Sequence, residues 1–161
     1  MSEERTPPPG LDATIQAGRD WLETVMYDPE GGECPCCTQR VKVYSRSIHA
    51  SEARALILAE REHGGEWFHA PTFADTAQLG GSWAMLRRWG LIEENTIPRE
   101  DGGRAGYWRI TEHGQAFVRG EVKVPKYSRI FDNHLLDHVG EPVSIIEALG
   151  DRFDYRALMS R

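Results

Sequence analysis

Two stretches of the chain repeat apolar residues at the spacing of an α-helix. In residues 11–27 they recur every three or four positions, which predicts an amphipathic helix. Residues 51–63 (SEARALILAEREH) carry a wide apolar stripe of alanine, leucine and isoleucine, and Ser51 can cap the start of this helix. We expect each helix to bury its apolar face against the rest of the protein.

Between and after these helices the pattern changes to short alternating segments. Residues 40–47 (RVKVYSRS) alternate apolar and basic positions, which predicts a half-buried strand with a basic outer face. Glycine pairs and capping residues divide the next part of the chain. The expected elements are a strand at 66–69, helices at 72–79 and 83–89, strands at 91–92 and 107–110, and a helix after Thr111.

This order of elements predicts an α+β fold with a winged helix-turn-helix core at residues 51–120. Ahead of the core we expect a disordered tail at residues 1–10, then a helix, a cysteine knuckle and a strand at residues 11–50. Residues 121–161 form a C-terminal arm that packs on the core. Pro125 favours an edge strand or an irregular segment in that arm, because proline lacks the N–H group that a central strand requires.

The rest of the arm is predicted to be a loop followed by two short helices. Residues 133–142 have the composition of a loop, and Ser144 and Asp154 are the expected helix caps. Apolar residues of the two helices either dock on the core or form the surface of a homodimer.

The charge of the chain is unevenly distributed. The net charge is −6, and residues 1–33 account for it with two basic and eight acidic residues. The remaining residues contain seventeen of each sign, so a basic face can still form there. No run of 18 apolar residues and no charged-then-apolar leader occurs, so we expect no membrane partner and a cytoplasmic location.

The helix at residues 83–89 is the segment that would read DNA in a winged helix. With about 100° per residue, Ser82, Met85, Leu86 and Trp89 fall on the core side. The outer face then carries Trp83, Arg87 and Arg88, which could enter a major groove and contact guanine edges or phosphates. The alternative is that the two arginines are only solvated and that Trp83 packs against the protein.

Further basic residues extend this candidate surface. Arg99 and Arg104 lie in the glycine-rich tip at residues 98–106, where they could hold the DNA backbone, although the neighbouring acids Glu100 and Asp101 oppose that role. The predicted strand at residues 40–47 adds Arg40, Lys42 and Arg46 on its outer face.

The three cysteines lie close together in the sequence, at Cys34, Cys36 and Cys37. C-P-x-C is a turn that lets two thiolates face one zinc ion, and a tetrahedral site requires four ligands. We predict a zinc site formed by these cysteines and a histidine from His49, His63 or His69, with His69 favoured because it lies in an extended segment. The alternative is a metal-free turn with reduced thiols.

Parts of the sequence resemble known bacterial proteins. The runs GLIE (90–93) and GYWRITEHG (106–114) are similar to those of bacterial winged-helix regulators, and the likeness covers residues 51–120. The C-P-x-C turn ahead of them, together with VPKY (124–127) and EALGDRFDY (147–155), resembles a family of small uncharacterised phage and prophage proteins. Thr38 stands where the usual knuckle carries glycine.

The resemblance implies a winged-helix fold and a phage or prophage setting, in the cytoplasm of a bacterial host cell. With the basic residues named above, it leads to the hypothesis of a DNA-binding regulatory protein whose partner is double-stranded DNA. The competing hypothesis is a protein-binding adaptor that uses the winged helix as a scaffold to engage a host protein, which the acidic N-terminal segment favours. No nucleophile elbow, Walker, H-E-x-x-H or dinucleotide-binding motif occurs, so we expect no enzyme.

Overall fold

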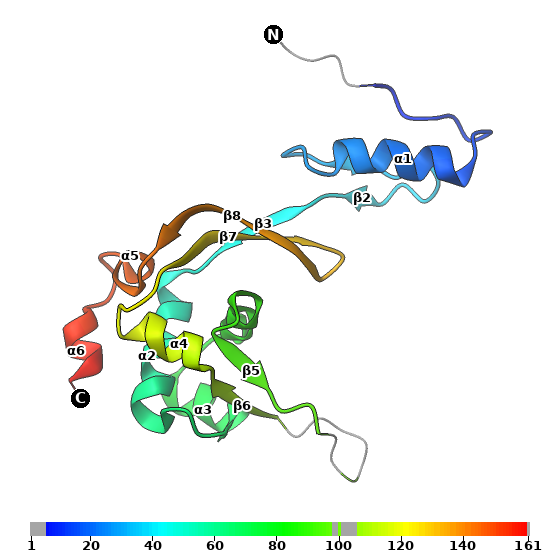
Figure 1. Cartoon of the computed structure of the whole chain (residues 1–161). Helices are drawn as coiled ribbons and strands as arrows, with labels where there is room; N and C mark the ends of the chain where they lie inside the picture. Colours follow the sequence, from blue (N-terminus) through cyan, green and yellow to red (C-terminus); the bar gives the residue numbers. More distant parts are fainter. Residues whose placement is uncertain (1–5, 98–99, 101–105, 161) are drawn as a thin grey trace. The chain divides into compact units, whose positions relative to one another are not determined.

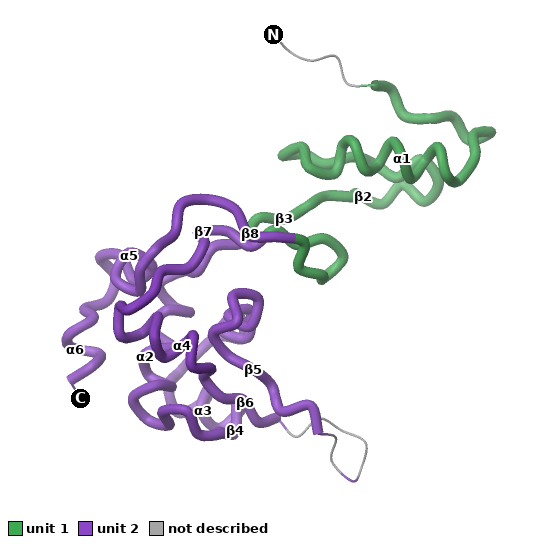
Figure 2. Tube along the Cα trace, in the orientation of Figure 1, with its two compact units in different colours: residues 1–45, 129–136 green, residues 46–128, 137–161 purple. Residues whose placement is uncertain are grey.

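The computed structural model describes residues 6–97, 100 and 106–160 (Figure 1). These residues form a mixed α+β fold with small antiparallel sheets. The chain divides into two compact units, one of residues 1–45 and 129–136, the other of residues 46–128 and 137–161 (Figure 2). Within the described ranges, no helix has the length and apolar character needed to cross a membrane.

The first unit contains one helix and a short hairpin. Its elements are α1 (Ile15–Val25), β1 (Gly32–Glu33) and β2 (Arg40–Val41). The side chain of Thr14 caps α1 by accepting a hydrogen bond from the N–H of Ala17 at 3.0 Å. β1 and β2 pair antiparallel, with Gly32 opposite Val41, and residues 34–39 form the turn between them.

The second unit is built around a long helix, half of whose residues are buried. The elements of this unit are β3 (Tyr44–Ser47), α2 (Ala50–His63), β4 (Phe68–His69), α3 (Ala70–Ala77), η1 (Gly81–Trp89), β5 (Ile92–Glu94), β6 (Tyr107–Ile110), α4 (Glu112–Val118), β7 (Val124–Phe131), β8 (His134–Val143), α5 (Ile145–Leu149) and α6 (Tyr155–Met159). Three of its strands, β3, β7 and β8, continue into the first unit. α2 packs against α4, α5, α6 and η1, and its residues 55–57 are at most 1% exposed. This helix is therefore the centre of the hydrophobic core.

The sheet beside this core has the strand order β4-β6-β5, with both pairs antiparallel. Trp108 and Ile110 alternate with Tyr107 and Arg109 along β6 and are buried in the core, at 8% and 2% exposure, as such an alternation indicates. Thr111 caps α4 as expected, because its hydroxyl accepts from the N–H of Gly114 at 3.0 Å. The division of the chain into a tail, an N-terminal part, a winged-helix core and a C-terminal arm remains a prediction.

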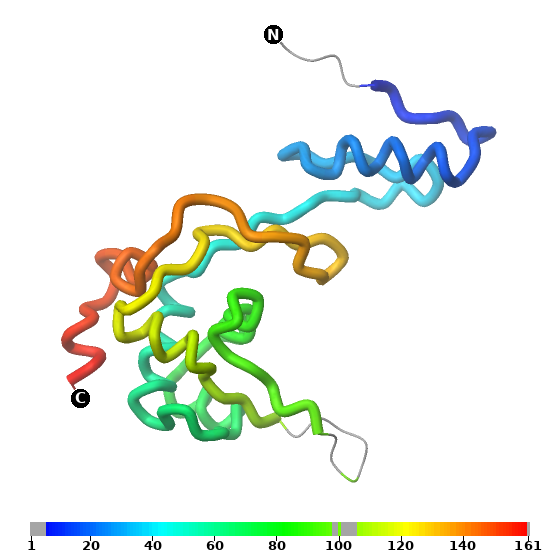
Figure 3. The backbone as a smooth tube through the Cα atoms, viewed as in Figure 1, coloured from blue at the N-terminus to red at the C-terminus, as the bar shows by residue number. Residues whose placement is uncertain are grey.

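The C-terminal arm differs from its prediction in two places. Residues 134–143 form strand β8 rather than a loop, because Asp132 and Asn133 both adopt positive φ (49° and 63°) and allow a tight hairpin with β7 (Figure 3). β7 is the central strand of the sheet β3-β7-β8, not an edge strand. It tolerates Pro125 because that residue is only the second of the strand.

The two short helices of the arm form where their caps predicted, and both pack on α2. Ser144 accepts from the N–H of Glu147 at 3.1 Å, and Asp154 accepts from the N–H of Arg156 at 2.9 Å. Ile145 and Leu149 are the buried residues of α5, each at 1% exposure, whereas Ile146 is 60% exposed.

Candidate nucleic-acid interface

The segment expected to read DNA is the 3-10 helix η1 rather than an α-helix. A 3-10 helix has three residues per turn, so side chains at every third position lie on one face. Trp83, Leu86 and Trp89 have this spacing, and all three are buried, at 7%, 0% and 5% exposure. The tighter winding of the 3-10 helix therefore buries a different set of side chains from the set expected for an α-helix, which turns about 100° per residue.

Trp83 is a core residue, which corrects its predicted place on the outer face. Its ring centroid lies 6.1 Å from those of Phe68 and Phe73 and 5.6 Å from that of Trp108. These aromatic contacts and its burial leave no indole face for a DNA base. We therefore remove Trp83 from the candidate interface.

The two arginines of η1 remain on its outer side. Arg87 is exposed and Arg88 is half-buried. Burial lowers the pKa of the Arg88 guanidinium, and the positive charges of Arg87 and then Arg46 lower it further. Arg46 from β3 therefore lies within electrostatic range of η1, and these three residues, all from the second unit, form what we call the arginine cluster.

Contacts with β7 and β8 hold the C-terminal end of η1. The indole N–H of Trp89 donates to the carbonyl oxygen of Pro125 at 2.8 Å. His138 Nε2 donates to the carbonyl oxygen of Arg88 at 2.8 Å, and its ring lies 6.4 Å from that of Trp89. Sequence analysis missed this supporting role, which depends on β8.

The other predicted DNA contacts lie in the first unit or outside the described residues. Arg40 and Lys42 belong to the first unit, where Arg40 Nη1 donates to the carbonyl oxygen of Glu30 at 2.5 Å and Lys42 Nζ lies 5.3 Å from the ring centre of Tyr44. Arg99 and Arg104 lie outside the described residues.

No protein-family model, curated protein or solved structure matches this chain. Its candidate sites are therefore judged on their own geometry.

Two backbone hydrogen bonds close the cysteine turn, the predicted metal knuckle. Cys34 N–H donates to the carbonyl oxygen of Gln39 at 2.8 Å, and Thr38 N–H donates to that of Cys34 at 3.0 Å. Thr38 adopts φ 65°, the left-handed conformation for which glycine is usual, so the turn forms without glycine. The backbone N–H groups of Cys37 and Cys36, and the Cys37 thiol, lower the pKa of Cys34 by stabilising its thiolate.

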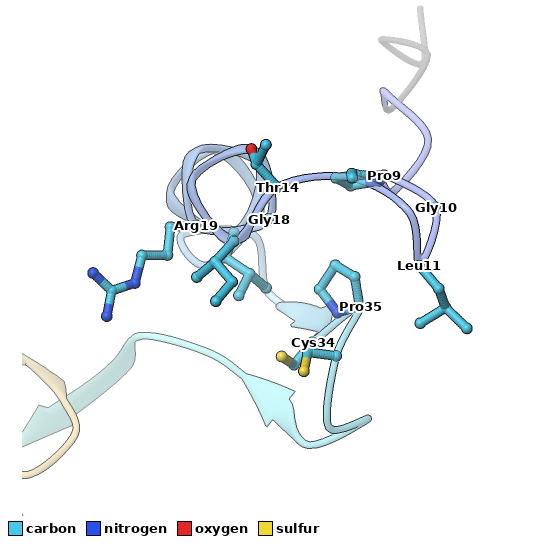
Figure 4. Close-up of a pocket in the computed structure, with 12 residues that line it drawn as sticks. Pro9, Gly10, Leu11, Thr14, Gly18, Arg19, Cys34 and Pro35 are labelled. Atoms are coloured by element: carbon cyan, nitrogen blue, oxygen red, sulfur yellow. The ribbon is translucent and has the colours of Figure 1, made fainter.

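An apolar cleft lies beside the knuckle within the first unit. It has a volume of about 380 Å³, and Cys34 and Pro35 face residues 9–22 across it (Figure 4). Leu11 and Ile15 line this cleft while remaining 89% and 79% exposed. The first unit therefore displays apolar surface next to its thiols.

The predicted fourth zinc ligand, His69, has a hydrogen-bond partner in the second unit. Its Nδ1 lies 2.7 Å from the hydroxyl of Thr72, and its ring lies 5.4 Å from that of Tyr107. Among the described residues, no three histidine, cysteine, aspartate or glutamate side chains are grouped closely enough to hold a metal ion. The set of Cys34, Cys36, Cys37 and His69 remains a prediction.

Proposed function

We propose that this chain is a DNA-binding protein and that residues 51–120 are a winged helix-turn-helix. The order α2-β4-α3-η1-β5-β6-α4 and the strand order β4-β6-β5 support this assignment. In such a fold, η1 occupies the position of the recognition helix. A regulatory role in a phage or prophage rests on the sequence resemblance alone.

The arginine cluster is the observation that carries the proposal. Arg46 and the pair Arg87 and Arg88 come from two segments far apart in the sequence, and the charges of Arg87 and Arg46 both act on Arg88. Positive charges gathered at the C-terminal end of η1 raise the local positive potential, which attracts an anion. A DNA backbone supplies closely spaced negative charges that match such a cluster.

The proposal is tested by replacing two cluster residues whose side chains are exposed. Arg46→Ala and Arg87→Ala together should weaken binding to a fluorescent random duplex by about tenfold or more at low salt, because at least one charge-assisted contact is lost. Arg156→Ala, an exposed arginine of α6, is the matched control and should retain wild-type affinity. Unchanged affinity in the double variant would remove η1 and β3 from the interface.

A protein-binding adaptor is the second candidate function, because the cleft lined by Leu11 and Ile15 offers exposed apolar surface. This function predicts that wild-type protein does not retard duplex DNA at tens of micromolar and low salt, where DNA-binding proteins usually show nonspecific binding. It also predicts that Leu11→Ser with Ile15→Ser abolishes capture of a host protein, whereas the Arg46→Ala and Arg87→Ala pair does not.

A further inference from the structure

A second, polar cavity opens on the second unit, where three distant parts of the chain meet. Its volume is about 230 Å³. The start of α2, the turn between α3 and η1, and the loop between α5 and α6 all contribute to its wall. The lining residues are Ser51, Arg54, residues 78–80, Ser82, Trp83, Arg152 and Phe153.

Two arginines of this lining are positioned by one aromatic ring. The guanidinium carbons of Arg54 and Arg152 lie 5.6 Å and 5.3 Å from the ring centre of Phe153. Arg54 Nη1 also donates to the carbonyl oxygen of Ala77 at 3.1 Å. Within the part of the chain that the structure describes, neither arginine forms an ion pair. Their charges are therefore held in place without an acidic partner.

The rest of the wall supplies hydrogen-bond donors rather than acidic groups. Ser82 contributes a hydroxyl group, and no side chain caps the N-terminal end of the nine-residue η1. Asp151 and Asp154 flank Arg152 and Phe153 along the chain but do not line this cavity. Glu52, which follows Ser51, is 3% exposed and accepts from the N–H of His49 at 2.9 Å and from the Ser51 hydroxyl at 3.4 Å. That carboxylate is thus occupied in capping α2.

A neighbouring hollow shows what distinguishes this cavity. It shares Arg54, Arg152 and Phe153, but its lining also includes Glu62 and Asp154. Acidic side chains repel an anion. The cavity at the start of η1 has no acid in its lining, so its chemistry suits a ligand that has several acceptor oxygens.

We propose that this cavity binds a phosphate group, with Arg54 and Arg152 contacting its oxygens and the Ser82 hydroxyl as a further donor. Arginine suits this ligand because its planar guanidinium can donate two parallel hydrogen bonds to a phosphate. This phosphate group has two possible sources, the backbone of a DNA duplex and free inorganic phosphate. The first source rests on the proposed function.

The test compares Arg152→Gln with Arg156→Gln, a nearby exposed arginine that does not line the cavity. Inorganic phosphate is titrated into labelled full-length protein and followed by NMR of the arginine side chains. We expect saturable shifts at Arg54 and Arg152 in the wild type, loss of the Arg54 shift in Arg152→Gln, and an unchanged response in Arg156→Gln. Arg54→Lys retains the positive charge but loses the planar guanidinium that donates two parallel hydrogen bonds, so it should weaken phosphate binding severalfold.

The second arm measures binding of a fluorescent duplex over a range of salt concentrations. If the site holds a backbone phosphate, Arg152→Gln lowers the affinity by about tenfold and reduces the slope of log K against log salt by about 0.9. Phosphate binding without any duplex binding by the wild type would assign the cavity to free phosphate and contradict the proposed function. Absence of phosphate shifts in the wild type, or equal behaviour of the two glutamine variants, would overturn the site itself.

Discussion

Trp83 and Trp108 meet edge to face, with ring centroids 5.6 Å apart and an angle of 67° between the rings. The contact joins η1, which carries Arg87 and Arg88, to the middle strand of the sheet β4-β6-β5. Edge-to-face aromatic pairs stabilise a core beyond the area that they bury. The tryptophan that a regular α-helix would turn outward therefore anchors the candidate interface from inside.

Replacing this anchor should destabilise the second unit. Trp83→Ala removes a buried indole and leaves a cavity, so we expect the free energy of unfolding to fall by about 3–5 kcal/mol. The measurement is chemical denaturation followed by circular dichroism. Trp67→Ala is the matched control, because Trp67 is 39% exposed and should cost much less. A wild-type midpoint for Trp83→Ala would mean that the indole does not pack in the core.

Gly114 allows α4 to lie close to the chain before β5. A Cβ atom at this position would stand 2.1 Å from the carbonyl oxygen of Leu91 and 2.7 Å from a methyl group of Ile110. In Gly114→Ala the backbone at Leu91 must therefore move. We expect the free energy of unfolding to fall by about 2 kcal/mol or more and the melting temperature to fall with it. Gly81→Ala is the control. A Cβ atom added at Gly81 has no atom within 4 Å, so this variant should leave the melting temperature nearly unchanged.

The Cys34 thiol should ionise more readily in the folded chain than in the unfolded one. Its pKa is lowered chiefly by the N–H groups of Cys37 and Cys36, and alkylation proceeds through the thiolate. We expect the pH midpoint of Cys34 alkylation, followed by peptide mass spectrometry, to shift upward when urea unfolds the protein. Because folding lowers this pKa, the associated stability is present above the unfolded-state pKa and is lost as the pH falls through the folded-state value. Equal midpoints in both states would contradict the knuckle hydrogen bonds.

Zinc content tests the predicted metal set directly. Protein purified without chelators should contain about one zinc ion per chain, and Cys34→Ser with Cys37→Ser should lower that value to near zero. His69→Ala should also reduce it if His69 is the fourth ligand, whereas His113→Ala, an exposed histidine of α4, should not. Elemental analysis of the wild type that finds no zinc would leave the turn as a metal-free knuckle.

The sequence alone determined the local elements of this protein. The apolar stripe of α2, the inward positions of Trp108 and Ile110, and the caps at Thr111 and Ser144 are set by neighbours within a few residues. Periodicity and capping depend on such short-range interactions, so they can be recognised without a structure.

The tertiary structure decided which of the candidate residues lie together. It wound residues 81–89 as a 3-10 helix with Trp83 inside, paired residues 134–143 as a strand, and brought Arg46 within range of Arg88. It also placed Arg54 and Arg152 on one aromatic ring. These features depend on packing, strand pairing and charges contributed by distant segments, and no periodicity within a single segment encodes them.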